Sequence, residues 1–233
     1  MKKLIIILAT IFAVSVATAG ETKRYELDVK DFNSLKVVQG VNVDYICNPD
    51  SAGIAVFTAE ARRASTLMFS NNSGVLSIQI DVADRQLTDI PTVTVYSSSL
   101  EKIENSGDST VRILRLVPGV RFMGKVIGNG RLSIRGIKAS DVKLTLATGN
   151  GTIVADGTTT NLKINFSGTG TIQADMLKAS DVTVRAGGTG AIGCSAASKL
   201  NIYGVGSTKI YYRGNPEIKN RSVGIKTEPI ANN

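Results

Sequence analysis

The chain has 233 residues, a formal net charge of +8 and no histidine. Without histidine it lacks the commonest general base and the commonest transition-metal ligand, so we expect neither a metal site nor a cofactor. Two cysteines exclude a disulfide-dense small fold. Aromatic residues make up 5% of the chain and are not interleaved with its basic residues, which argues against nucleic acid as a partner.

The N-terminus has the layout of a secretory signal. Lys2 and Lys3 precede an apolar run over residues 4–16, and Ala17-Thr18-Ala19 supplies the small residues that precede a cleavage site. The apolar run is shorter than the roughly 20 residues that cross a bilayer. We therefore expect cleavage after Ala19 and an exported protein of the periplasm, cell surface or medium, with no membrane span in the mature chain.

Residues 21–99 predict irregular β-structure. Short alternating apolar segments indicate strands at Leu35–Val38, Val41–Ile46, Ile54–Thr58, Val75–Val82 and Thr92–Tyr96. Asn71-Asn72-Ser73-Gly74 predicts a turn, and residues 59–63 predict a short helix, the only one expected in the mature chain.

From Gly107 onward the sequence repeats about every 20 residues. Gly-x-Gly pairs begin at Gly128, Gly149, Gly168, Gly188 and Gly204. The segment Lys138–Val142 recurs letter for letter as Lys178–Val182. Between these landmarks apolar and polar residues alternate, which predicts two short strands per unit, each with one buried face. Such a unit cannot bury itself alone, so the pattern predicts an all-β solenoid with coils about 4.8 Å apart.

Turn geometry explains the glycines of the repeat. Corners between short strands often need a positive φ, which glycine adopts without steric cost. The G-x-G-x-x-G match at Gly188–Gly193 is part of this repeat, and no helix is predicted after it to hold a dinucleotide. The run that starts at Gly187 resembles a calcium-binding nonapeptide but has Ile192 where that motif needs a carboxylate.

The chain divides into three segments. Residues 1–19 form the expected leader. Residues 20–214 form one continuous β-helix-like domain, because no linker rich in Pro, Gly or Ser separates its halves. Residues 215–233 contain two prolines and little periodicity, so we expect a cap or a tail on the last coil.

Both cysteines fall at positions that are expected to face inward. Cys194 aligns with Ala155 and Ala174 of the preceding units, where a thiol acts as a small apolar filler. Cys47 continues the alternation of Val43 and Tyr45. The two cysteines lie several coils apart, and a disulfide needs Cα atoms within about 7 Å. We predict two free, buried thiols.

A run of basic residues is the most distinctive charge feature of the sequence. Residues 109–140 contain seven basic residues and no acid: Arg112, Arg115, Arg121, Lys125, Arg131, Arg135 and Lys138. One interpretation is a strip that binds acidic glycan, and the other is a set of solvated faces whose bases keep strand edges from aggregating. By the repeat, Lys143 and Lys163 should stack on one face, and Arg135 is placed to pair with Asp156 of the next coil.

The order of several segments resembles the head GIN domain family, which is named for auto-transporter adhesins and is common in exported proteins of Bacteroidetes. The segments are Phe32–Val37, Gly40–Val43, Val75–Ile78, Val93–Tyr96 and Leu100–Gly107, followed by the Gly-x-Gly coils. The resemblance covers roughly residues 32–214. It implies a β-helix-like fold, a location outside the cytoplasm and an adhesive role, and it carries over no functional residue.

These observations predict a non-enzymatic, adhesin-like binding protein of the bacterial cell envelope. The expected partner is an acidic polysaccharide, lipopolysaccharide or a cell-surface protein. One alternative is a polysaccharide-degrading β-helix enzyme, a hydrolase or lyase, in which Asp156 and Asp175 of adjacent coils are the candidate carboxylates. Another alternative is a purely structural envelope component. The fold class does not choose among them.

Overall fold

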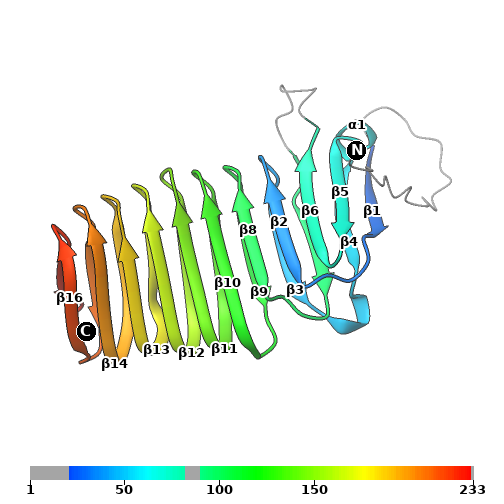
Figure 1. Ribbon diagram of the computed structural model, residues 1–233. Coiled ribbons are helices and arrows are strands. Elements are labelled where there is room, and N and C mark those ends of the chain that lie inside the picture. The colour runs from blue at the N-terminus through cyan, green and yellow to red at the C-terminus, as the bar shows by residue number, and fades with distance from the viewer. Residues whose placement is uncertain (1–20, 82–89, 232–233) are drawn as a thin grey trace.

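The computed structural model describes residues 21–81 and 90–231. The expected leader lies outside the described residues, as does the last residue of the strand expected at 75–82. The described chain is an all-β solenoid in which all 17 strands are linked by hydrogen bonds (Figure 1). The predicted fold class is therefore confirmed, including the repeat of about 20 residues per coil.

The regular part of the solenoid consists of long strands in parallel register. These are β10 (Gly119–Ile127), β11 (Arg131–Ala147), β12 (Thr152–Ser167), β13 (Thr171–Ala186) and β14 (Ala191–Val205), each paired with the next. Register irregularities interrupt these strands near their middles: between Ile134 and Ile137 in β11, between Val154 and Asp156 in β12, and between Ala174 and Lys178 and between Ala179 and Asp181 in β13. Each of β11–β14 therefore turns a corner and contributes one half to each of the two long faces, whereas β10 lies on one of them.

The N-terminal strands do not follow the chain order along the solenoid. They are β1 (Thr22–Asp28), β2 (Ser34–Val38), β3 (Val43–Cys47), β4 (Ile54–Glu60), β5 (Leu67–Asn72), β6 (Val75–Ile80), β7 (Val93–Ser97), β8 (Lys102–Ser106) and β9 (Thr110–Arg115). Strand β2 pairs with both β6 and β8, and β3 pairs with both β7 and β9. The first coil of the chain is thus the second in space, and Figure 1 shows β2 between β6 and β8.

Antiparallel strands cover the N-terminal end of the solenoid. Strand β4 pairs with β7 and β1, and β5 pairs with β6. The helix α1 (Ala61–Ala64) forms where a short helix was predicted. Sequence analysis did not predict β1, β5 or the 3-10 turn η1 (Pro49–Ser51), whose Asn48 side chain caps the amide of Asp50. Strand β1 gives a weak pattern because charged residues fill its outward positions and its inward side is only half-buried.

Aliphatic ladders form the core. In one of them every member is fully buried and lies in register with the residue of the next coil: Val43, Val111, Leu132, Ile153, Ile172, Ile192 and Ile210. The inward assignment of Ile153 and Ile172 made from the alternation is confirmed. Stacking buries each side chain between two others, which is how a unit with one apolar face gains stability.

Two constraints require glycine at the turns: a positive φ at some positions and the close approach of neighbouring coils at others. Gly128 and Gly149 have positive φ, as the turn argument predicts. Gly170 and Gly188 do not, and a Cβ on either would lie 2.0 Å from a carbonyl oxygen of the coil below. At these positions glycine is required because neighbouring turns stack without room for a side chain.

The cysteine prediction is confirmed. Both cysteines are free and buried. Cys194 lies in register with Ala174, and the Cys47 thiol donates a hydrogen bond to the Ser98 carbonyl oxygen at 3.1 Å. Burial raises the pKa of Cys194 to about 12, and the nearby charge of Asp175 adds to the effect.

Strands continue beyond Gly214. The last strands are β15 (Lys209–Arg213), β16 (Glu217–Val223) and β17 (Lys226–Pro229). Strand β16 pairs in parallel with β14, and β17 pairs with β15, so the segment expected to be a cap or tail lies against the preceding coil as strands. Asn220 lies in register with buried Ile202, and its side chain accepts hydrogen bonds from the amide and hydroxyl of Ser222.

Candidate functional site

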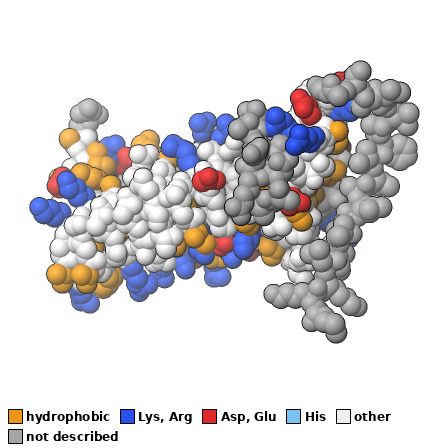
Figure 2. All heavy atoms as spheres, turned by 90° about the horizontal axis from the view of Figure 1, so that it is seen from above, with side chains coloured by type: hydrophobic (Ala, Val, Ile, Leu, Met, Phe, Trp, Pro, Cys, Tyr) orange, Lys and Arg blue, Asp and Glu red, His pale blue; other side chains and the backbone are white. Residues whose placement is uncertain are grey.

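The solenoid presents two long faces. The β10 face carries the outward residues of β2, β8, β10, β16 and the C-terminal halves of β11–β14. The β9 face carries those of β3, β9, β15, β17 and the N-terminal halves of β11–β14. Figure 2 shows the molecule from above the view of Figure 1, with Lys and Arg side chains on both long sides.

The structure does not bring the seven predicted basic residues into one strip. Arg121 and Lys125 lie on the β10 face, in register with Asp141 and Thr145. Arg112, Arg131 and Arg135 lie on the β9 face, Arg115 lies at the end of β9, and Lys138 lies at the corner between the faces. Because each half of a coil lies on a different face, a basic run longer than half a coil places residues on both faces.

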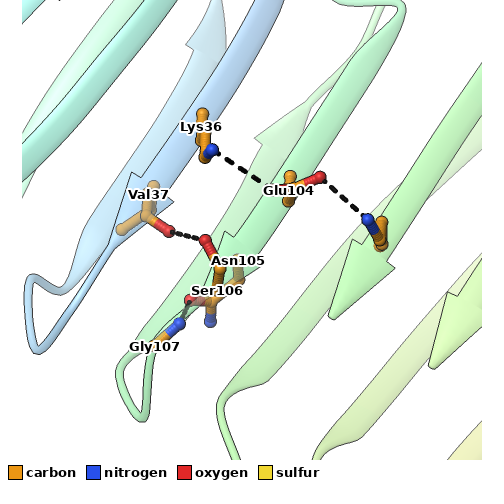
Figure 3. Close-up of polar contacts among 7 residues, drawn as sticks. Lys36, Val37, Glu104, Asn105, Ser106 and Gly107 are labelled. Atoms are coloured by element: carbon orange, nitrogen blue, oxygen red, sulfur yellow. Dashed lines mark hydrogen bonds and ion pairs between the residues drawn. The ribbon is translucent and has the colours of Figure 1, made fainter. Parts of the chain in front are cut away.

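Two of the seven form ion pairs between coils. Arg112 donates to both carboxylate oxygens of Asp44 at 2.6 and 2.7 Å, and these bonds, with the charge of Asp44, raise the pKa of Arg112. Lys125 Nζ lies 3.2 Å from the Glu104 carboxylate, which Lys36 approaches from the other side at 3.7 Å (Figure 3). These contacts tie neighbouring coils together.

Of the other predicted basic residues, Arg115 contacts the backbone and Arg135 lacks the partner that was expected. Arg115 Nε donates to the Cys47 carbonyl oxygen at 2.8 Å. The expected ion pair between Arg135 and Asp156 is wrong: Asp156 Oδ1 instead accepts a hydrogen bond from the Gly136 amide at 2.7 Å. The corner begins at Gly136, so the backbone turns there and presents its amide where a side-chain partner was expected.

A groove of about 490 Å³ crosses β10, β11, β12 and β13 on the β10 face. Its basic residues are Arg121, Lys143 and Lys163, and its acidic residues are Asp141 and Asp181. Asn161 donates a hydrogen bond to Asp141 at 3.0 Å across one coil step. Asp181 Oδ1 is shielded from solvent and has no hydrogen-bond partner among the described residues. The groove therefore combines exposed cations with carboxylate oxygens.

Lys143 and Lys163 stack directly on each other in this groove, as predicted from the repeat. In Lys36–Glu104–Lys125 and Asp44–Arg112, by contrast, basic residues of adjacent coils meet carboxylates. A second like-charge pair in register, Lys209 and Lys226, lies on the β9 face. Among the described residues, neither Lys143 nor Lys163 forms an ion pair. Like charges on neighbouring strands are destabilising, so this stack costs stability that the fold itself does not require.

The candidate carboxylates of the enzyme alternative both have structural contacts. Asp175 Oδ2 accepts a hydrogen bond from Arg213 Nε at 3.1 Å, and Asp156 accepts one from the backbone amide of Gly136. Within residues 21–81 and 90–231, no group of three or more acidic or cysteine residues is placed to hold a metal ion. In the same part of the chain, no helix is long and apolar enough to cross a membrane.

The fold and the groove define a class of protein, a β-solenoid that presents stacked polar ladders on its long faces. Comparison with known families gives a closer assignment. Residues 31–216 match the family described as "Putative auto-transporter adhesin, head GIN domain", and the chain belongs to this family. This confirms the resemblance seen in the sequence. No curated protein matches the chain.

Solved structures with the same fold come from Bacteroides and Parabacteroides. A protein of Bacteroides fragilis named as a putative adhesin superposes with a TM-score of 0.81 at 20% identity, covering 90% of this chain and 96% of its own. A Parabacteroides distasonis protein named as a putative lipid binding protein gives a TM-score of 0.72 at 19% identity, covering 91% and 98%. A putative adhesin of Parabacteroides merdae gives 0.72 at 16% identity, covering 91% and 97%. At these identities the likeness shows the fold.

Proposed function

We propose that this protein is a non-enzymatic, adhesin-like protein of the cell envelope that binds an acidic glycan in the groove on the β10 face. The observation that carries the proposal is the unpaired stack of Lys143 and Lys163 on adjacent coils. An anionic ligand that bridges the two ammonium groups removes their repulsion. The stack is thus a cost in the free protein that becomes a source of affinity in the complex.

The other groove residues suit a sugar polymer. Arg121 adds a bidentate donor for a carboxylate, sulfate or phosphate group, and Asn161 and Thr183 add neutral donors and acceptors. The carboxylates of Asp141 and Asp181 are acceptors for sugar hydroxyl groups. Met123, which is partly exposed, supplies apolar surface for the C–H side of a sugar ring. Because the groove crosses several coils, a linear chain lying along the solenoid axis meets polar side chains on each coil and a lysine on two of them.

Membership in a family of adhesins supports a position outside the cytoplasm, as the expected leader does. The similar protein named for lipid binding makes the acidic glycan of lipopolysaccharide a candidate beside free polysaccharide. A cell-surface protein is the remaining candidate partner.

The proposal is tested by retention of the exported, processed protein on an immobilised acidic polysaccharide along a salt gradient. The double variant Lys143→Ser/Lys163→Ser should elute at lower salt, while its melting temperature stays close to that of the parent. Exposed charges contribute at most about 1 kcal/mol each to stability, and removing two like charges that stack does not weaken the fold. Retention of the parent should fall as salt rises, because exposed charges are screened beyond about 8 Å at physiological ionic strength.

A matched variant decides which face binds. Arg131→Ser/Arg135→Ser removes the same charge from the β9 face. If this pair weakens retention and the lysine pair does not, binding takes place on the β9 face and the groove assignment is wrong. Retention that is independent of salt would point to a neutral or protein partner. Shortening of the polysaccharide during incubation would favour the enzyme alternative.

A further inference from the structure

Apolar side chains gather at the corner between the two long faces. We call this row of turns the corner edge; it comprises residues 114–120, 138–140, 158–160, 176–180 and 195–198. The loop between β9 and β10 belongs to it and lies at the lower edge in Figure 1. On the corner edge Val120 is 71% exposed, Met176 61%, and Leu114 and Val117 43% each.

The concentration of these residues is unusual for this protein. Outward positions of the long strands are mostly polar or charged, whereas Leu114, Leu116, Val117 and Val120 follow one another within seven positions. Single exposed aliphatic residues are common on soluble proteins, but a cluster at a projecting loop indicates a surface that is covered in use.

Basic residues extend along the corner edge away from the apolar loop. Lys138, Thr158 and Lys178 form one ladder along the corner edge, and both lysines are exposed. Residues 109–140 contain no acid, and the acids that follow the corners, Asp141 and Asp181, line the groove on the β10 face. The corner edge therefore presents apolar tips beside uncompensated positive charge.

The shape of the corner edge favours a fluid partner over a folded one. A shallow depression of about 410 Å³ beside the loop is lined by Gly119, Lys138–Ser140 and Thr158–Thr160. These are small or flexible residues, and no aromatic anchor of the kind that dominates protein–protein interfaces lines the depression. Aliphatic tips flanked by lysines match the boundary between headgroups and acyl chains, and acidic headgroups attract the lysines.

We infer that the corner edge docks on an anionic lipid surface, with Val117 and Val120 inserted at the acyl boundary and Lys138 and Lys178 beside lipid phosphates. The inference is independent of the glycan groove. Docking at the corner leaves both long faces in solution, so the groove stays accessible while the protein is on the membrane.

The chain has no tryptophan, so a single introduced tryptophan reports on its own surroundings. Val120→Trp places the reporter on the corner edge. Val205→Trp places a matched reporter in a glycine turn, where Val205 is 67% exposed. Each variant, exported and processed, is titrated with vesicles of phosphatidylcholine alone and of phosphatidylcholine mixed with phosphatidylglycerol.

We expect the emission of Val120→Trp to shift to the blue with the mixed vesicles and that of Val205→Trp to stay unchanged. Adding Val117→Asp to Val120→Trp should lower vesicle partitioning at least about tenfold. Adding Lys138→Ser and Lys178→Ser should lower it about tenfold on mixed vesicles and leave partitioning on neutral vesicles unaltered. Both sets of changes lie on exposed residues, and unchanged thermal melting checks that the variants fold.

Three results would overturn the inference. The first is no blue shift of Val120→Trp on mixed vesicles, and the second is an equal shift of Val205→Trp. The third is a shift that depends on protein concentration without vesicles, together with a dimer in sedimentation, which would assign the corner edge to contacts between copies. Glycan retention of Val117→Asp should equal that of the parent, so failure of this inference is distinguishable from failure of the groove proposal.

Discussion

Replacing Ile172 with alanine should test the ladder architecture most directly. Ile172 is fully buried and lies in register with Ile153 on one side and Ile192 on the other. At about 0.8 kcal/mol per buried methylene, transfer alone accounts for roughly 2 to 3 kcal/mol. The neighbours above and below are fixed by parallel hydrogen bonds, so they cannot move far into the cavity. The cavity then brings the loss of unfolding free energy to about 3 to 5 kcal/mol.

The loss should be measured by urea unfolding at 25 °C, followed by far-UV circular dichroism, which should also show a nearly pure β spectrum for the parent. Gln173→Ala is the matched control, because Gln173 is the next residue of β13 and points outward. Its effect should stay within about 0.5 kcal/mol. Ile172→Val should fall between the two, at about 0.5 to 1.5 kcal/mol.

Two results would refute the ladder assignment. One is an unfolding free energy of Ile172→Ala within about 0.5 kcal/mol of the parent. The other is an equal loss in Gln173→Ala. Ile172→Asp gives a coarser check, because it buries an unpaired charge between aliphatic residues and should prevent stable folding.

Other predictions concern the turns and the thiols. Gly188→Ala should lower stability by more than about 1 kcal/mol, because its Cβ would meet the Gly168 carbonyl oxygen at 2.0 Å, whereas at Gly187 a Cβ meets nothing within 4 Å and the change should be tolerated in the same melting assay. A thiol reagent should label neither Cys47 nor Cys194 in the native protein and both after denaturation without reductant; a mass two units below the reduced value would contradict this. Burial raises the pKa of Cys194 from 9.0 to about 12, so the unfolded chain binds fewer protons between these values and stability should fall as pH rises through that window. Cys194→Ala should lessen the fall in urea unfolding at high pH, and an equal fall in both proteins would show that the thiol does not contribute.

The regular coils could be predicted because their pattern is local and repeated. The period of about 20 residues is by itself enough to place Leu132, Ile153 and Ile172 on one ladder. The order of the first coils could not be predicted in the same way. Strands β6 and β7 read as alternating segments, but nothing in that alternation tells whether they lie before or after β2 and β3 in space. Which distant strands pair depends on how side chains from the whole chain pack together in the core.

The candidate site could likewise be predicted only in part. The basic residues nearest in sequence are separated in space, because a run such as Arg121–Arg135 passes from the β10 face through a glycine turn to the β9 face. Lys143 and Lys163, twenty positions apart, are neighbours. In a solenoid the informative spacing for a site is one period, and the repeated lysine after Asp141-Val142 and Asn161-Leu162 is the sequence signal that marks the groove.

The two ends of the solenoid explain why binding should occur along its sides. At one end antiparallel β1, β4 and β5 cover the ladders. At the other end β16 and β17 place Asn220 in register with Ile202 and Thr227 in register with Ile210, so polar groups stand where the previous coil has aliphatic ones. Asn220 also turns its oxygen to the amide and hydroxyl of Ser222. One ladder does reach this end, because Ile218 lies in register with Leu200 and is 38% exposed, so the polar groups interrupt the apolar surface without removing it. Polar groups on a terminal repeat weaken end-to-end stacking of such proteins. The surfaces left for recognition are the long faces, which carry the unpaired Lys143–Lys163 stack, and the corner edge, which carries the exposed Val117 and Val120.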